Sequence, residues 1–147
     1  MFCEQILSQI QKFPCHWIIW TGGEPTMQLT DACLQFFRDA GFRQAVESNG
    51  SNRLSALLDY TAVSPKGRMS DARTINPRVD EIRLPIRNND RIPSIESLPE
   101  AQYYFLSPVF SNEPEETKAN IDYCMQQILQ SPKWRLSLQM HKLIGIT

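Results

Sequence analysis

The sequence lacks three features that would place it in a common class of protein. Its apolar runs are only a few residues long, whereas a membrane-spanning helix needs about 20. Its formal net charge is −1, so no excess of positive charge favours a nucleic acid or an anionic membrane as a partner. Its opening residues include Glu4 and lack the basic segment of a signal peptide. We therefore expect a cytoplasmic protein that binds neither nucleic acid nor membrane.

Cysteine is also scarce and widely spaced. The four cysteines are Cys3, Cys15, Cys33 and Cys124, and no two or three of them form a C-x-x-C or C-x-x-x-C-x-x-C cluster. In a cytosolic chain we expect these thiols to be reduced. Cys33 and Cys124 fall on the apolar faces of predicted helices, which is typical of small core residues. The cysteines therefore predict no metal site.

Helices and strands alternate along the chain. Apolar residues at helical spacing predict helices, and short β-branched or aromatic runs predict strands. We predict helices over residues 3–13, 31–40, 51–59 and 114–131, a loop over 66–78, and at most a very short helix within 87–100. We predict strands over residues 16–20, 42–47, 60–63, 80–86, 101–106 and 134–139.

This alternation predicts an α/β fold with a mostly parallel sheet of about six strands. A complete eight-stranded βα barrel needs roughly 200 residues or more, so 147 residues can form only a partial barrel. No repeat, low-complexity tract or linker divides the chain. We therefore predict a single domain over residues 1–147.

Polar clusters follow each predicted strand directly. In parallel α/β folds ligands bind at the carboxyl ends of the strands, so these clusters predict one binding edge. Each cluster also has a simpler interpretation, such as a tight turn, a solvated lysine or a structural histidine, and only their common position favours a site. The clusters are Thr21–Pro25, Glu47–Gly50, Ser64–Lys66, Arg87–Asn89, Ser107–Pro108, and Gln139 with His141 and Lys142.

The residue types suit a ligand that carries an amino acid and a ribose. Glu24 can pair with an ammonium group, and the two glycines before it allow a ligand to approach the main chain. Residues 47–49 offer polar groups for a ribose. Lys66 can bind a carboxylate, and Gln139 offers a donor and an acceptor to the edge of a pterin or purine.

Four segments carry a family resemblance. They are TGGEP at 21–25, ESNG at 47–50, SPK at 64–66, and the terminal PKWRLSLQMHKLIGI at 132–146. Together these segments resemble the radical S-adenosylmethionine (SAM) enzymes, and most closely the 7-carboxy-7-deazaguanine synthases of queuosine and deazapurine biosynthesis. TGGEP marks only the superfamily, whereas SPK with RLSLQ-x-HK is more specific to this synthase. The resemblance runs from about Trp17 to the end of the chain.

The resemblance implies a reaction, cofactors and site residues. The family converts 6-carboxy-tetrahydropterin to 7-carboxy-7-deazaguanine: a reduced [4Fe–4S] cluster cleaves SAM, and the resulting radical starts a ring contraction. Members also use Mg²⁺ and commonly form homodimers. The implied SAM-binding residues are Thr21, Gly22, Gly23, Glu24, Glu47, Ser48, Asn49, Ser64 and Lys66. The implied residues for the pterin substrate are Gly23, Lys66, Gln139 and His141.

The sequence departs from that family mildly in ESNG at 47–50 and in LPIRNND at 84–90, and more seriously in segments that it lacks. The C-x₃-C-x₂-C loop that holds the cluster, the first strand and the adjoining Mg²⁺-binding residues are not in the sequence. We therefore expect the C-terminal two-thirds or so of a synthase, whether a fragment, a misplaced start or a true truncation, with no metal ligands of its own and no activity alone. Two alternatives stay open: a glycyl-radical activating enzyme, and a non-catalytic remnant that acts as a binding module.

Overall fold

A computed structural model describes residues 3–66 and 68–145. The strands are β1 (Trp17–Trp20), β2 (Arg43–Ser48), β3 (Tyr60–Val63), β4 (Arg78–Ile86), β5 (Glu100–Pro108) and β6 (Trp134–Leu136). The helices are α1 (Cys3–Ile10), α2 (Asp31–Asp39), α3 (Met69–Ile75), α4 (Pro114–Gln130) and α5 (Met140–Leu143), with short 3₁₀ turns η1 (Pro25–Met27) and η2 (Ile95–Ser97). Of the helices in these ranges, none combines the length and the apolar character that crossing a bilayer requires.

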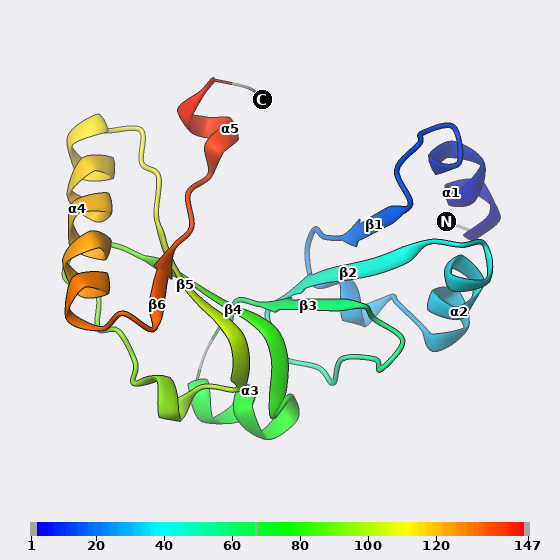
Figure 1. The fold of residues 1–147 in the computed structure, drawn as a ribbon, viewed down its shortest axis with the longest axis horizontal. Coiled ribbons are helices and arrows are strands. Elements are labelled where there is room, and N and C mark those ends of the chain that lie inside the picture. The colour runs from blue at the N-terminus through cyan, green and yellow to red at the C-terminus, as the bar shows by residue number, and fades with distance from the viewer. Residues whose placement is uncertain (1–2, 67, 146–147) are drawn as a thin grey trace.

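The six strands form one parallel sheet in chain order, from β1 at one edge to β6 at the other. The sheet is curved, with α2 near its β1 end and α4 outside β5 and β6 (Figure 1). In the described part of the chain β1 and β6 do not pair, so the sheet stays open. The prediction of a partial βα barrel with about six parallel strands is therefore confirmed.

Side chains of alternate residues divide the sheet into two faces. The face towards the helices is apolar: Ile82 and Leu84 of β4 and Leu106 of β5 are almost fully buried together with Cys124 of α4. The intervening residues of β4 point to the other face, which carries charge. The buried Cys124 confirms the sequence prediction for that residue, and the apolar layer leaves the opposite face free for a polar site.

Two predictions between β2 and β4 are wrong. Residues 51–59 form turns rather than a helix, because the buried side chain of Asn76 holds their backbone. Its NH₂ group donates to the carbonyls of Gly50 and Asn52, at 3.3 and 2.9 Å, and its side-chain oxygen accepts from the Leu54 N–H at 2.9 Å.

Conversely, the helix α3 forms within residues 66–78, where the sequence predicted a loop. Its amphipathic pattern is weak, and Ala72 packs next to the close-fitting Gly50. Both outcomes depend on contacts between distant residues, which periodicity cannot show.

The end of the chain also differs in part. The strand predicted over 134–139 ends at Leu136, and the short helix α5 follows at Met140. The Ser137 N–H still bonds the Leu106 carbonyl at 2.9 Å, but the chain then leaves the sheet. The other strands agree to within two residues, and the very short helix predicted within 87–100 is η2. The first helix ends at Ile10, before the predicted limit of residue 13.

Candidate functional site

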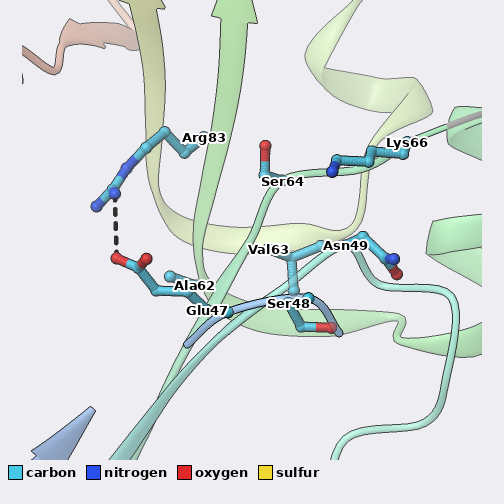
Figure 2. A pocket seen from close by; sticks show the side chains of 10 residues that line it. Glu47, Ser48, Asn49, Ala62, Val63, Ser64, Lys66 and Arg83 are labelled. Atoms are coloured by element: carbon cyan, nitrogen blue, oxygen red, sulfur yellow. Dashed lines mark hydrogen bonds and ion pairs between the residues drawn. The ribbon is translucent and has the colours of Figure 1, made fainter. Parts of the chain in front are cut away.

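A pocket lies at the carboxyl ends of β1, β2 and β3, with a volume of about 270 Å³. Figure 2 shows side chains around it from the ends of β2 and β3 and from Arg83 of β4. Its lining residues are Gly22, Gly23, Glu47, Ser48, Asn49, Ala62, Val63, Ser64, Lys66 and Arg83. Three of the clusters predicted from the sequence therefore meet in one cavity, at the edge of the sheet where the sequence predicted a site.

The loop after β1 presents main chain rather than side chain to the pocket. Gly22 and Gly23 have φ angles of +82° and +37°, a region that side chains of L-residues disfavour. Apart from the glycine and its two neighbours in the chain, no atom lies within 4 Å of where a Cβ would stand at either position. Packing of the protein itself therefore does not require glycine there. The backbone conformation does, and the open space beside it is available to a ligand.

Glu24 connects this loop to the end of β2. Its Oε1 accepts hydrogen bonds from the N–H and hydroxyl of Thr26, at 3.1 and 2.5 Å, and from the Ser48 hydroxyl at 2.8 Å. Its Oε2 accepts from the Asn49 N–H at 2.7 Å. Burial raises the pKa of the Glu24 carboxyl, but the bonds from Thr26, Asn49 and Ser48 outweigh burial and hold the pKa below its ordinary value. Glu24 is thus an ionised link between two walls of the site.

The face of the sheet beneath the pocket carries a charged network. Arg83 lies between two carboxylates: its Nη1 is 3.3 Å from Glu47 Oε1, and its Nη2 is 2.6 Å from Glu81 Oε1. The hydroxyl of Tyr60 donates to Glu81 Oε2 at 2.9 Å. The dashed line in Figure 2 marks the contact between Arg83 and Glu47. Opposite charges on β2 and β4, the two strands that flank β3, thus hold the side chains at the bottom of the pocket.

The structure brings together seven of the predicted site residues and leaves four outside the pocket. Those that line it are Gly22, Gly23, Glu47, Ser48, Asn49, Ser64 and Lys66. Thr21 and Glu24 line a neighbouring cavity of about 360 Å³ that also contains Cys3 and Cys33. Gln139 and His141 are exposed at the start of α5 and do not line the 270 Å³ pocket.

Arg83 is the charged pocket residue that sequence reasoning missed, and the apolar Ala62 and Val63 also line the pocket. The signal was present in the strand DEIRLPI, where Glu81 and Arg83 alternate with apolar residues. That alternation puts both charges on one face, opposite the apolar core. The cross-strand register brings Glu81 beside Ala62, and Ala62 beside Glu47. The period of two therefore predicts that the charges lie together, but their position beneath the pocket depends on the register.

The described residues do not provide ligands for an iron–sulfur cluster or another metal ion. No group of three or more His, Cys, Asp or Glu side chains lies close enough to hold a metal within residues 3–66 and 68–145. Cys3 and Cys33 meet with their sulfur atoms 2.9 Å apart, but two thiols do not form such a set. Burial and the contact with Cys3 raise the pKa of the Cys33 thiol to about 12, which disfavours the thiolate that a metal needs. We therefore assign no step to a cluster.

Curated relatives cover almost the whole chain. It is 36% identical to the 7-carboxy-7-deazaguanine synthase of Bacteroides thetaiotaomicron, over 97% of this chain and 72% of the relative. It is 38% identical to the synthase of the same name from Haemophilus influenzae, over 97% of this chain and 71% of the relative. The chain belongs to the 7-carboxy-7-deazaguanine synthase family. No protein-family model matches it.

The chain spans only part of the length of these synthases. A relative of the same name from Bordetella pertussis is 36% identical over 88% of this chain but only 59% of its own length. The fold agrees with a crystal structure of QueE from Escherichia coli, at a TM-score of 0.66 and 20% identity, over 95% of this chain and 64% of that one. At that identity the likeness supports the fold alone. The activity of a whole synthase is therefore a proposal for this chain.

Proposed function

We propose that this chain binds SAM in the 270 Å³ pocket and supplies the SAM-binding part of a 7-carboxy-7-deazaguanine synthase. The observation that carries the proposal is the meeting of three sequence clusters, from the ends of β1, β2 and β3, in one cavity. Parallel α/β folds bind ligands at this edge. The family membership supports the identity of the ligand.

The methionyl and ribose groups of SAM have partners of suitable chemistry in the pocket and in the adjoining cavity that Glu24 lines. The main chain at Gly22 and Gly23 is open to the methionyl group, and Oε2 of Glu24 accepts one protein hydrogen bond and keeps capacity for an ammonium donor. Lys66 is exposed at the pocket and suits the methionyl carboxylate as a point charge. Glu47 suits the hydroxyls of the ribose. The polar ends of the ligand therefore face opposite charge or hydrogen-bonding groups.

The pterin substrate is the second part of the proposal. In a synthase, SAM supplies the group that activates the substrate, and the protein orients both and excludes water. Gln139 and His141 follow β6 at the carboxyl side of the sheet, so they suit the substrate end of the site. The relatives named above are synthases rather than glycyl-radical activating enzymes, which favours the first of the two enzymatic hypotheses.

The test is calorimetric titration of the chain with SAM and with decarboxylated SAM. We expect the unaltered chain to bind SAM about tenfold more tightly, because one charge-assisted contact with the carboxylate contributes about 1.4 kcal/mol or more. Lys66→Met should remove that preference. The matched control is Lys118→Met on the exposed surface of α4, where Lys118 pairs with Asp122. Failure of the unaltered chain to bind SAM would contradict the proposal.

Measurements of turnover and of oligomeric state test two further expectations, the enzymatic reaction and the homodimer. The chain is incubated without oxygen with iron, sulfide, a reductant, SAM and 6-carboxy-tetrahydropterin, and the products are separated by mass spectrometry. We expect SAM binding but no ring contraction, since the described residues contain no set of cluster ligands. Formation of 7-carboxy-7-deazaguanine would show that this chain is sufficient and would contradict that expectation. Light scattering tests the predicted homodimer.

A further inference from the structure

Arg83 is placed to control the geometry of Glu47 rather than to bind a ligand itself. Its guanidinium faces Glu81 on one side, at 2.6 Å, and Glu47 on the other, at 3.3 Å. The side chain of Glu81 is 8% exposed, that of Arg83 37%, and that of Glu47 49%. Burial thus falls along the row from Glu81 to Glu47. The pair formed by Glu81 and Arg83 is the more buried one, and we call it the anchor. The carboxylate of Glu47 is the one that solvent or a ligand can reach.

The anchor is held on its far side as well. Tyr60 donates its hydroxyl hydrogen to Glu81 Oε2 at 2.9 Å. Burial, followed by this bond to Glu81, raises the pKa of Tyr60, so the phenol stays protonated and remains a donor. Glu81 thus accepts a hydrogen bond on Oε2 and forms an ion pair with Arg83 on Oε1, although within the described residues neither Oε1 nor Arg83 Nε makes a hydrogen bond. The ion pair with this buried carboxylate keeps the guanidinium of Arg83 next to Glu81.

Glu47 then presents one occupied and one open oxygen to the pocket. Oε1 accepts from Arg83, and in the part of the chain that the structure describes Oε2 accepts no hydrogen bond. Figure 2 shows the carboxylate of Glu47 beneath Arg83, on the strand next to Ser64. A carboxylate that is fixed in this way can accept hydrogen bonds from two adjacent hydroxyl groups without losing further rotamer freedom.

We infer that Arg83 is a positioning residue that fixes the Glu47 carboxylate for a vicinal diol, and so makes this pocket select a ribose over a 2′-deoxyribose. The inference rests on the proposed function, because it concerns the nucleoside end of the SAM site. Two hydroxyls on one carboxylate contribute more than one. Removal of the 2′-hydroxyl deletes a hydrogen bond to a charged group, which changes affinity about tenfold or more.

The test measures displacement of SAM by 5′-deoxyadenosine and by 2′,5′-dideoxyadenosine. We expect the unaltered chain to bind the ribose form about tenfold more tightly. The double variant Glu81→Gln with Arg83→Met removes the anchor without leaving a buried charge unpaired, and its preference should fall below about twofold. A merely structural role would lower both affinities equally. The control is Arg78→Met, at the opposite end of β4, where Arg78 pairs with the exposed Glu100 at 3.1 Å.

Each outcome bears on one claim. If the unaltered chain does not bind SAM, the proposed function fails and this inference fails with it. If the chain binds SAM but does not discriminate between the two nucleosides, or if the double variant discriminates as well as the unaltered chain, the inference alone is overturned. Loss of discrimination in the double variant, with the preference for SAM over decarboxylated SAM retained, supports the role of Arg83.

Discussion

Glu24→Gln tests whether a single carboxylate holds the loop after β1 against the end of β2. The amide oxygen of glutamine can still accept from Thr26 and Ser48. Its NH₂ group, however, meets the Asn49 N–H, which now bonds the carboxylate at 2.7 Å. The unsatisfied donor costs about 1–3 kcal/mol, and the three remaining bonds lose up to about 1 kcal/mol each without the charge.

The expected total is smaller than that sum, because Glu24 is only half-buried and such contributions do not add. We expect the free energy of unfolding to fall by about 2–4 kcal/mol and the Tm by roughly 5–15 °C, which differential scanning calorimetry measures. Glu4→Gln, the same change at an exposed position of α1, is the control. A fall in Tm of less than about 2 °C, equal to that of the control, would refute the role of Glu24 as a link.

The lowered pKa of Glu24 also predicts how the stability of the protein changes with pH. The folded-state pKa of Glu24 lies below its ordinary value of 4.5, so its contribution to stability is fully present above that value. It is lost as the pH falls through the lower folded-state pKa. The difference in urea midpoint between the unaltered chain and Glu24→Gln should therefore narrow as the pH falls below 4.5 and stay constant at pH values well above it. A difference that grows towards acid pH would contradict this assignment.

Three further substitutions, with Gly41→Ala as their control, test the site and its supports. Gly22→Ala and Gly41→Ala both place alanine at positive φ in open space and should each cost about 1–2 kcal/mol, but only Gly22→Ala should weaken SAM binding in a titration. Gly50→Ala should cost more than Gly41→Ala in urea unfolding, because its Cβ would stand 2.7 Å from Cγ1 of Val63. Asn76→Ala should speed hydrogen exchange in residues 51–58 at least tenfold, since its three hydrogen bonds hold that segment; unchanged exchange would refute that role.

The sheet could be predicted from the sequence because each strand carries its own local signal. Runs such as Trp17–Trp20 and Tyr60–Val63 are short and apolar, and turn residues follow them directly. The sequential strand order that the structure shows agrees with the short connections between consecutive strands. The helix of residues 69–75 and the turns of 51–59 could not be predicted, because the side chain of Asn76 and the packing of Ala72 decide them.

The site could be predicted in part for the same reason. Clusters at strand ends meet because parallel strands share one edge, which brought Glu47 and Lys66 into the same pocket. Arg83 escaped notice because its position depends on the register between β3 and β4. For Gln139 and His141, the chain leaves the sheet after Leu136, so a position in sequence after β6 did not bring them to the pocket.

A crystal structure of the chain with S-adenosylhomocysteine tests the central claim most directly. The account predicts density for the nucleoside between the loop after β1 and the ends of β2 and β3, with the ribose on Glu47 and the carboxylate on Lys66. Density for the nucleoside in the cavity beside Cys3 and Cys33, or no density at saturating concentration, would contradict it.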